Sequence, residues 1–168
     1  MFWFDWMALA IVLGTAITQA VRAVKAGGMG LPLFEGLGLI VAAVGSINLS
    51  GPVASTLHMQ KSTVLIVIFL ILGIGAFIAG RWLFTITSWS FESFDGLLGF
   101  LFGVAGGWAV ANVVLRVIME SQGVSGPVAT MMGNSLIARE IYEFRAWNWL
   151  VRLLFRARLS PEFDPDVG

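Results

Sequence analysis

Two acidic residues in otherwise apolar segments are the positions of this sequence best suited to chemistry. Glu35 lies in the string FEGL and Asp95 in the string FDGL, and each string opens a glycine-rich hydrophobic run. Arg22 or Arg81 ends the run before each of them. Ionisable groups in membrane segments often mark a proton site or a gate. The alternative, which we favour, is that both are helix-start acids that pair with nearby basic groups and face the positive helix end.

The repeated string also suggests a duplicated two-helix hairpin, related by an axis along the membrane normal. In a four-span protein the connectors before Glu35 and Asp95 lie on one side of the membrane. We therefore expect Arg22, Glu35, Arg81 and Asp95 to form one charged layer at that interface.

The remaining residues offer no second set of groups for catalysis or metal binding. His58 is the only histidine and there is no cysteine, whereas a metal site or a nucleophilic triad needs several such ligands or partners. The phosphate-loop and HExxH strings are both absent. We therefore expect no metal, no cofactor and no enzymatic activity. Ten basic and ten acidic residues cancel, which argues against a nucleic-acid partner.

The elements that position these residues are predicted to be membrane-spanning helices. Hydrophobic residues make up 58% of the 168-residue chain and charged residues 12%, against about 25% charged in ordinary soluble domains. A spanning helix needs roughly 20 largely apolar residues. The sequence therefore predicts an all-α, four-helix membrane bundle over residues 1–120, with polar connectors at 23–30, 49–62 and 81–94. The four runs are Trp6–Val21, Leu31–Asn48, Thr63–Gly80 and Leu97–Ile118.

Small residues recur at every fourth position of these runs. Association of helices in lipid depends on close backbone packing, which small residues permit. We expect these positions to pack the bundle, although a homo-oligomer contact or a thin pore lining remains an alternative. They are Gly99, Gly103, Gly107 and Ala111 in the fourth run, Ala10, Gly14 and Thr18 in the first, Gly38, Ala42 and Ser46 in the second, and Gly75 and Ala79 in the third.

The segment after the fourth run is polar enough to lie outside the membrane. Residues 121–134 are predicted to form a linker, and 135–159 an amphipathic helix with Asn134 or Ser135 as its cap. The charges of this helix, among them Arg145, Arg152 and Arg156, favour a position along the lipid surface. Residues 160–168 are predicted to be a loose acidic tail.

A spaced series in the fourth run matches a known pattern: Asp95, Leu98–Gly99, Phe102–Gly103 and Gly107. It resembles the signature of the colicin V production (CvpA) family, which typically reads Asp-Arg, Leu-Gly, Phe-Gly and Arg-Gly along its fourth span. Gly96 and Gly106 stand where the family has arginines. The resemblance covers residues 4–120 and implies a small four-span inner-membrane protein, linked to colicin V production or export and to envelope homeostasis, with no established catalytic residue.

We therefore expect a non-enzymatic, multi-pass protein of the bacterial inner (plasma) membrane that acts through protein contacts. Its expected partners are the lipid bilayer, other membrane or envelope proteins and, as an open alternative, a second copy of the chain. Two other functions remain open. One is a small transporter or channel gated by the charged layer, and the other is an accessory subunit of a larger membrane complex.

The basic residues close to the spans bear on orientation. Arg22, Lys25 and Arg81 outweigh Lys61, and basic residues near span ends favour the cytoplasmic side. This predicts that the connectors before Glu35 and Asp95 are cytoplasmic and that both termini are outside. The arginines of the C-terminal segment argue for the reverse orientation.

Overall fold

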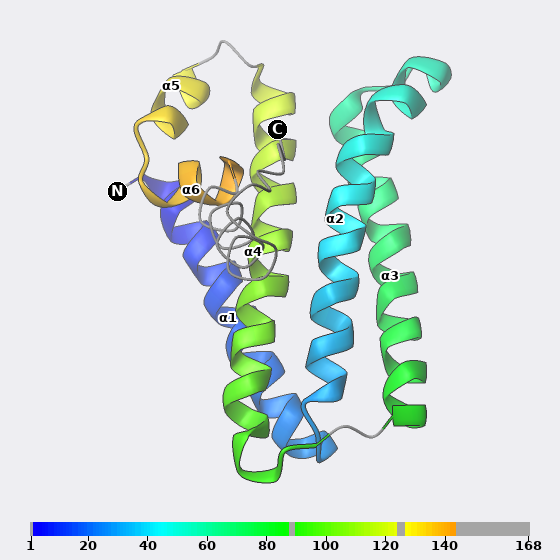
Figure 1. Ribbon diagram of the computed structural model, residues 1–168. Helices are drawn as coiled ribbons and strands as arrows, with labels where there is room; N and C mark the ends of the chain where they lie inside the picture. Colours follow the sequence, from blue (N-terminus) through cyan, green and yellow to red (C-terminus); the bar gives the residue numbers. More distant parts are fainter. Residues whose placement is uncertain (1, 88–89, 124–126, 144–168) are drawn as a thin grey trace, which may run out of the picture.

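The computed structural model describes residues 2–87, 90–123 and 127–143, and every regular element among them is helical (Figure 1). This confirms the predicted all-α class and its four long helices. A single-turn 3-10 helix, η1 (Glu92–Phe94), precedes the fourth of them. The helices are α1 (Trp3–Ala26), α2 (Gly30–Leu57), α3 (Lys61–Thr87), α4 (Asp95–Gln122), α5 (Pro127–Gly133) and α6 (Ile137–Glu143).

All four long helices are long and apolar enough to cross a membrane. They contain 24, 28, 27 and 28 residues, or roughly 36–42 Å at 1.5 Å per residue, against a hydrocarbon core of about 30 Å. The chain therefore has the architecture of a multi-pass membrane protein.

Two predicted connectors are much shorter than expected, because α2 and α3 continue through them. α2 runs past Pro52 to Leu57, and the hydroxyls of Ser55 and Thr56 donate to the Pro52 carbonyl oxygen. His58 is the C-cap residue that follows Leu57, and its left-handed backbone (φ 53°) directs the chain into α3. Polar residues and proline at 49–57 thus mark a helix end that projects beyond the apolar run, not a loop.

α3 likewise continues through the polar residues that follow Gly80. The hydroxyls of Thr85 and Thr87 donate to the carbonyl oxygens of Arg81 and Leu83 at 2.9 and 2.8 Å. Threonine satisfies its hydroxyl within a helix in this way, so its presence does not end the helix. The turn between α1 and α2, in contrast, lies within the predicted connector. Gly27 there has a left-handed backbone (φ 69°), and its N–H donates to the Ala23 carbonyl oxygen.

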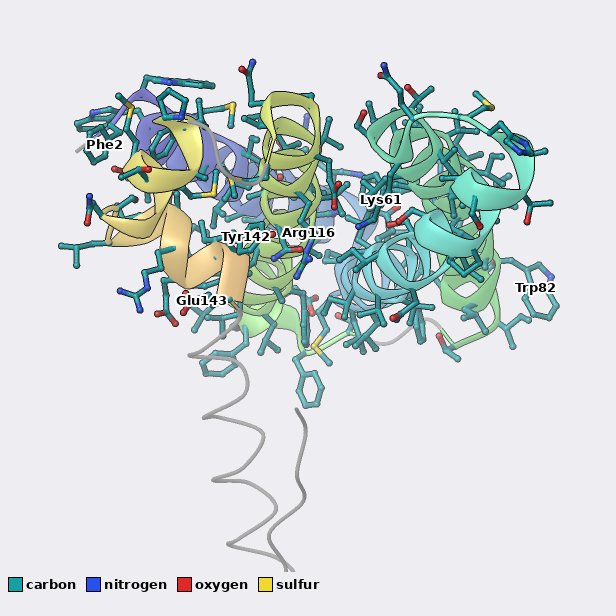
Figure 2. All side chains as sticks on the ribbon, turned by 90° about the horizontal axis from the view of Figure 1, so that it is seen from above. Phe2, Lys61, Trp82, Arg116, Tyr142 and Glu143 are labelled. Carbon is teal, nitrogen blue, oxygen red and sulfur yellow. The ribbon has the colours of Figure 1, made fainter. Side chains whose placement is uncertain are left out.

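The long helices pack as two pairs. α1 packs along α4 and α3 packs along α2, and contacts between α2 and α4 join the pairs (Figure 1). If α1 is exchanged with α3 and α2 with α4, the same pairs of helices are in contact. A duplicated two-helix hairpin would give this arrangement. α3 is at the edge of the bundle, and its outer face carries exposed apolar side chains such as Ile71, Ile78 and Trp82. Figure 2 shows Trp82 directed away from the other helices.

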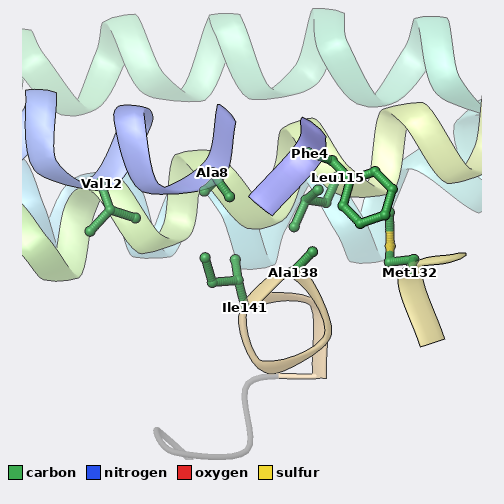
Figure 3. Close-up of a cluster of buried hydrophobic side chains, with 8 residues drawn as sticks. Phe4, Ala8, Val12, Leu115, Met132, Ala138 and Ile141 are labelled. Carbon is green, nitrogen blue, oxygen red and sulfur yellow. The ribbon is translucent and has the colours of Figure 1, made fainter. Parts of the chain in front are cut away.

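The chain after α4 folds back onto the start of α1. Residues 127–133, predicted to be part of a linker, form the short helix α5. α6 then packs against α1 and α4, and Ala138 and Ile141 join Phe4, Ala8 and Leu115 in an apolar cluster (Figure 3). Of the terminal helix predicted over 135–159, the structure describes this first part. Arg145, Arg152, Arg156 and the acidic tail lie outside the described residues.

Candidate functional site

Glu35 is a fully buried acid in the second turn of α2. Both of its carboxylate oxygens accept hydrogen bonds from the Arg22 guanidinium, Nη1 to Oε2 and Nη2 to Oε1, the second at 2.7 Å. Gln19 Nε2, one turn earlier on α1, donates to Oε2 at 2.7 Å. A forked arginine–carboxylate pair is among the strongest polar contacts in proteins. The acid is thereby compensated inside the bundle by side chains of another helix.

Gly80 of α3 closes the other side of this cluster. A Cβ added there would lie 3.3 Å from Glu35 Cγ and 3.3 Å from the Glu35 backbone nitrogen. The glycine therefore lets α3 approach α2 at the height of the buried acid. This contact places Gly80, seven residues before the end of α3, beside the acid that binds Arg22.

Asp95, the first residue of α4, binds the segments on either side of it. Its Oδ1 accepts from Met29 N at 3.0 Å and from Phe91 N at 2.8 Å, and its Oδ2 accepts the Ser90 hydroxyl at 2.6 Å. Carboxylates that accept several backbone N–H groups are held firmly in place. Asp95 therefore joins the α1–α2 turn to the approach to α4.

The four residues of the predicted charged layer differ in their described surroundings. Arg22 and Glu35 form one ion pair, Asp95 is bound by backbone N–H groups and a serine, and Arg81 is exposed. The expectation that both acids would pair with basic groups is met at Glu35, whereas the contacts described at Asp95 are with Met29, Ser90 and Phe91. The turn that contains Gly27 places the Met29 N–H where it donates to Asp95.

The fourth-run glycines form a ridge on α4, here called the glycine ridge (Gly99, Gly103 and Gly107), which lies in direct backbone contact with α1. Real Cβ atoms essentially never approach another heavy atom below 3.0 Å, so a side chain here would push the helices apart. Ala111 continues the same face and is fully buried. An added Cβ would lie 2.6 Å from Ala23 Cβ at Gly99, 2.6 Å from Ala16 Cα at Gly103 and 2.9 Å from Val12 Cα at Gly107.

Small residues on the other helices were predicted with mixed success. Gly38 packs on α3, where an added Cβ would lie 2.6 Å from Ala76 Cβ. Gly14 and Gly75, in contrast, are exposed with open space around them, so the expectation that they pack the bundle is wrong. Alanines of α1 and α3, among them Ala16 and Ala76, lie opposite glycines of α4 and α2, because a methyl group still permits close approach.

Two further glycines, not selected from the sequence, join α2 to α4. A Cβ added at Gly36 would lie 2.9 Å from the Phe102 carbonyl oxygen, and one added at Gly106 would lie 3.3 Å from Gly36 Cα. Gly36 directly follows Glu35 in the FEGL string, and that repeated string was the available signal.

A second polar cluster, also missed from the sequence, fixes α6 at the opposite end of the bundle. Asp5 Oδ1 accepts the Ser135 hydroxyl and the Ala138 N–H, and the Ser135 oxygen caps α6 by accepting the same N–H at 3.0 Å. The prediction that Asn134 or Ser135 caps this helix is therefore confirmed for Ser135. The sequence around Asp5 is apolar and gives no sign of a partner, because Ser135 and Ala138 lie 130 and 133 residues further along the chain.

Asn112 of α4 completes this attachment. Its Nδ2 donates to the carbonyl oxygens of Ile141 at 2.7 Å and Tyr142 at 3.1 Å, and its Oδ1 accepts Arg116 Nε at 3.0 Å. The Arg116 guanidinium lies 4.8 Å from the centre of the Tyr142 ring (Figure 2). Two carbonyl groups of α6 are therefore bound by a side chain of α4.

Within the described residues, no group of three His, Asp or Glu side chains is arranged to hold a metal ion. No protein-family model, curated protein or solved structure matches this chain. Proposals about its function therefore depend on the residues and contacts described above.

Proposed function

We propose that this chain is a non-enzymatic protein of the bacterial inner membrane, similar to the colicin V production family, that supports toxin production or export, or envelope homeostasis, through protein contacts. The observation that supports this proposal is that the residues that carry the resemblance make contacts that hold the bundle together. Asp95 binds the segments on one side of the bundle, and Gly99, Gly103 and Gly107 bring α4 against α1. Residues so engaged favour a rigid membrane scaffold over a reaction centre.

The test is photo-cross-linking in native membranes, with a cross-linking residue placed in turn at exposed positions such as Leu37, Leu70 and Leu101. The proposal predicts that one face yields a reproducible adduct with a specific envelope protein. The other positions should cross-link to lipid only. Uniform labelling of abundant membrane proteins at every position would contradict a contact-based role.

A second candidate function is a transporter or channel gated by charge. The observation that favours it is the full burial of the ionisable Glu35 beside Arg22, because such groups often serve proton pathways. Flux measured in proteoliposomes separates the two functions. The scaffold proposal predicts no ion or proton flux above protein-free vesicles. Flux that disappears in Glu35→Gln or Asp95→Asn, in variants that remain folded, would favour the transporter instead.

A third candidate, an accessory subunit of a larger complex, differs from the scaffold in stoichiometry. Mild detergent extraction followed by size-exclusion chromatography distinguishes the two. A subunit elutes in a complex of constant composition, whereas a scaffold that makes transient contacts elutes alone and is captured only by cross-linking.

A further inference from the structure

A groove with a volume of about 410 Å³ runs along one side of the bundle between α1 and α3. These two helices do not contact each other over their described lengths, and Leu39 of α2 lies between them. Gly14 and Thr18 of α1 and Phe77 of α3 line its length. The absence of a side chain at Gly14 leaves this part of the groove open. The groove is therefore apolar over most of its length.

One end of the groove is cationic. Arg22 and Gln19 line it there, and Arg22 is one helical turn beyond Thr18. The contact of Gly80 with Glu35, which itself binds Arg22, places the following residue, Arg81, at the same height. Arg81 also comes one turn after Phe77, and residues four apart share a helix face.

The two arginines differ in how their charge is used. Arg22 is neutralised by Glu35, although its guanidinium has five N–H donors and its side chain keeps 31% of its surface exposed. Arg81 is exposed and forms no ion pair with a described residue. The groove end thus carries a net positive charge together with unused hydrogen-bond donors. Arg22 is also close to the end of α1 at Ala26, which is where lipid headgroups would begin.

We propose that this groove binds an anionic phospholipid from the leaflet on the side of the α1–α2 turn. One acyl chain lies along Gly14, Thr18 and Phe77, and the phosphate is bound by Arg81 and by the remaining N–H groups of Arg22. Anionic headgroups are attracted by basic residues at the interface, and arginine suits phosphate because its donors form a planar fork.

Charge complementarity favours a lipid over a second copy of the chain. A copy inserted in the same orientation would bring its own Arg22 and Arg81 to the same height, and like charges at an interface oppose association. A phosphate group removes this conflict. A lipid also fits an open lateral groove, because it reaches the site from the bilayer.

The test is native mass spectrometry of the full-length chain in detergent, titrated with phosphatidylglycerol and with phosphatidylcholine of identical acyl chains. The wild-type chain should bind phosphatidylglycerol more tightly. Arg81→Gln should weaken phosphatidylglycerol binding about fivefold, as expected for one interfacial arginine. It should weaken phosphatidylcholine binding less, because the choline ammonium opposes the attraction of the neighbouring phosphate for arginine. Lys25→Gln is the matched control, because Lys25 is exposed on the same side of the bundle and lines a different surface depression. It should change either affinity by less than about twofold, because a charge outside the groove is screened.

A second variant tests the apolar part of the groove without a change in charge. Gly14→Leu fills open space and should weaken binding of both lipids, whereas Gly75→Leu, at an exposed glycine of α3 that is outside the groove, should not. Equal wild-type affinity for the two lipids, or equal effects of Arg81→Gln and Lys25→Gln, would overturn the proposal. So would a wild-type dimer in the same spectra that Gly14→Leu converts to monomer.

Discussion

At the scale of single residues, three buried polar side chains are bound by partners from other segments of the chain. Glu35 is bound by α1 side chains, Asp95 by backbone N–H groups of Met29 and Phe91, and Asn112 by two carbonyl groups of α6. In a low-dielectric interior a charge that loses its partner costs far more than the same charge in water. These contacts therefore specify which helices lie together, and each can be tested by removal of one partner.

Glu35→Gln should lower the free energy of unfolding by about 3 kcal/mol, because it leaves Arg22 without its counter-charge within the bundle. The control is Glu120→Gln, which breaks the more exposed Lys61–Glu120 pair and should cost less than about 1 kcal/mol. Unfolding by sodium dodecyl sulfate in mixed micelles, followed by circular dichroism, measures both. Equal losses would mean that the Arg22–Glu35 pair is as weak as a surface pair.

At the scale of helices, the bundle depends on close approach of backbones. The glycine ridge of α4 packs against small residues of α1, so the two helices are in contact where both have small side chains or none. Apolar side chains gain little when they leave lipid for another helix, and the stabilisation comes from packing at short range. The distance between the α1 and α4 backbones, and not the hydrophobicity of the contact, therefore controls the stability of this helix pair.

Gly103→Ala should therefore destabilise the bundle by about 1–3 kcal/mol, as overpacked cores do. The added methyl would lie 2.6 Å from Ala16 Cα, which is backbone and cannot move independently. Gly75→Ala is the control, because its surroundings are open and alanine is the better helix former by about 1 kcal/mol. The same unfolding assay compares them, and a neutral or stabilising effect at Gly103 would show that α1 and α4 are not in contact there.

The attachment of α6 gives a prediction for local stability. Asn112→Ala removes the amide group that donates to the Ile141 and Tyr142 carbonyls. It should speed amide exchange in α6 roughly 5- to 150-fold, given a cost of about 1–3 kcal/mol for buried groups left unpaired. Asn48→Ala, which breaks only a local bond to Val44, should leave that exchange unchanged. Hydrogen exchange with mass spectrometry of peptides covering residues 137–143 measures this. Unchanged exchange in Asn112→Ala would mean that the Asp5 contacts and apolar packing hold α6 without Asn112.

The elements were more predictable than their ends and contact faces. Long apolar runs and a spaced glycine series indicated four helices and the face of α4 that packs. Pro52 and the threonines after Arg81 suggested connectors, yet both lie in helices that project past the apolar core. Gly14 shows the other limit, because the spacing of small residues alone does not tell which face meets a neighbour. The partners of Asp5 and Asn112 lie far along the chain, and such pairs leave no local signal.

At the scale of the whole molecule, the two connections before Glu35 and Asp95 lie at one end of the bundle, and the α2–α3 turn lies at the other (Figure 1). The helices that join these ends are apolar and longer than a bilayer core is thick. A bundle of this kind crosses the membrane four times, with the groove between α1 and α3 open to lipid.

The most direct test of that claim is cysteine labelling in sealed membrane vesicles, since the chain contains no cysteine of its own. Single substitutions at exposed positions, Lys25→Cys, Met59→Cys and Phe94→Cys, are treated with a membrane-impermeant maleimide before and after permeabilisation. Four crossings predict that Lys25→Cys and Phe94→Cys react from one side and Met59→Cys from the other. Labelling of all three from the same side, or of Lys25→Cys and Phe94→Cys from opposite sides, would contradict the account.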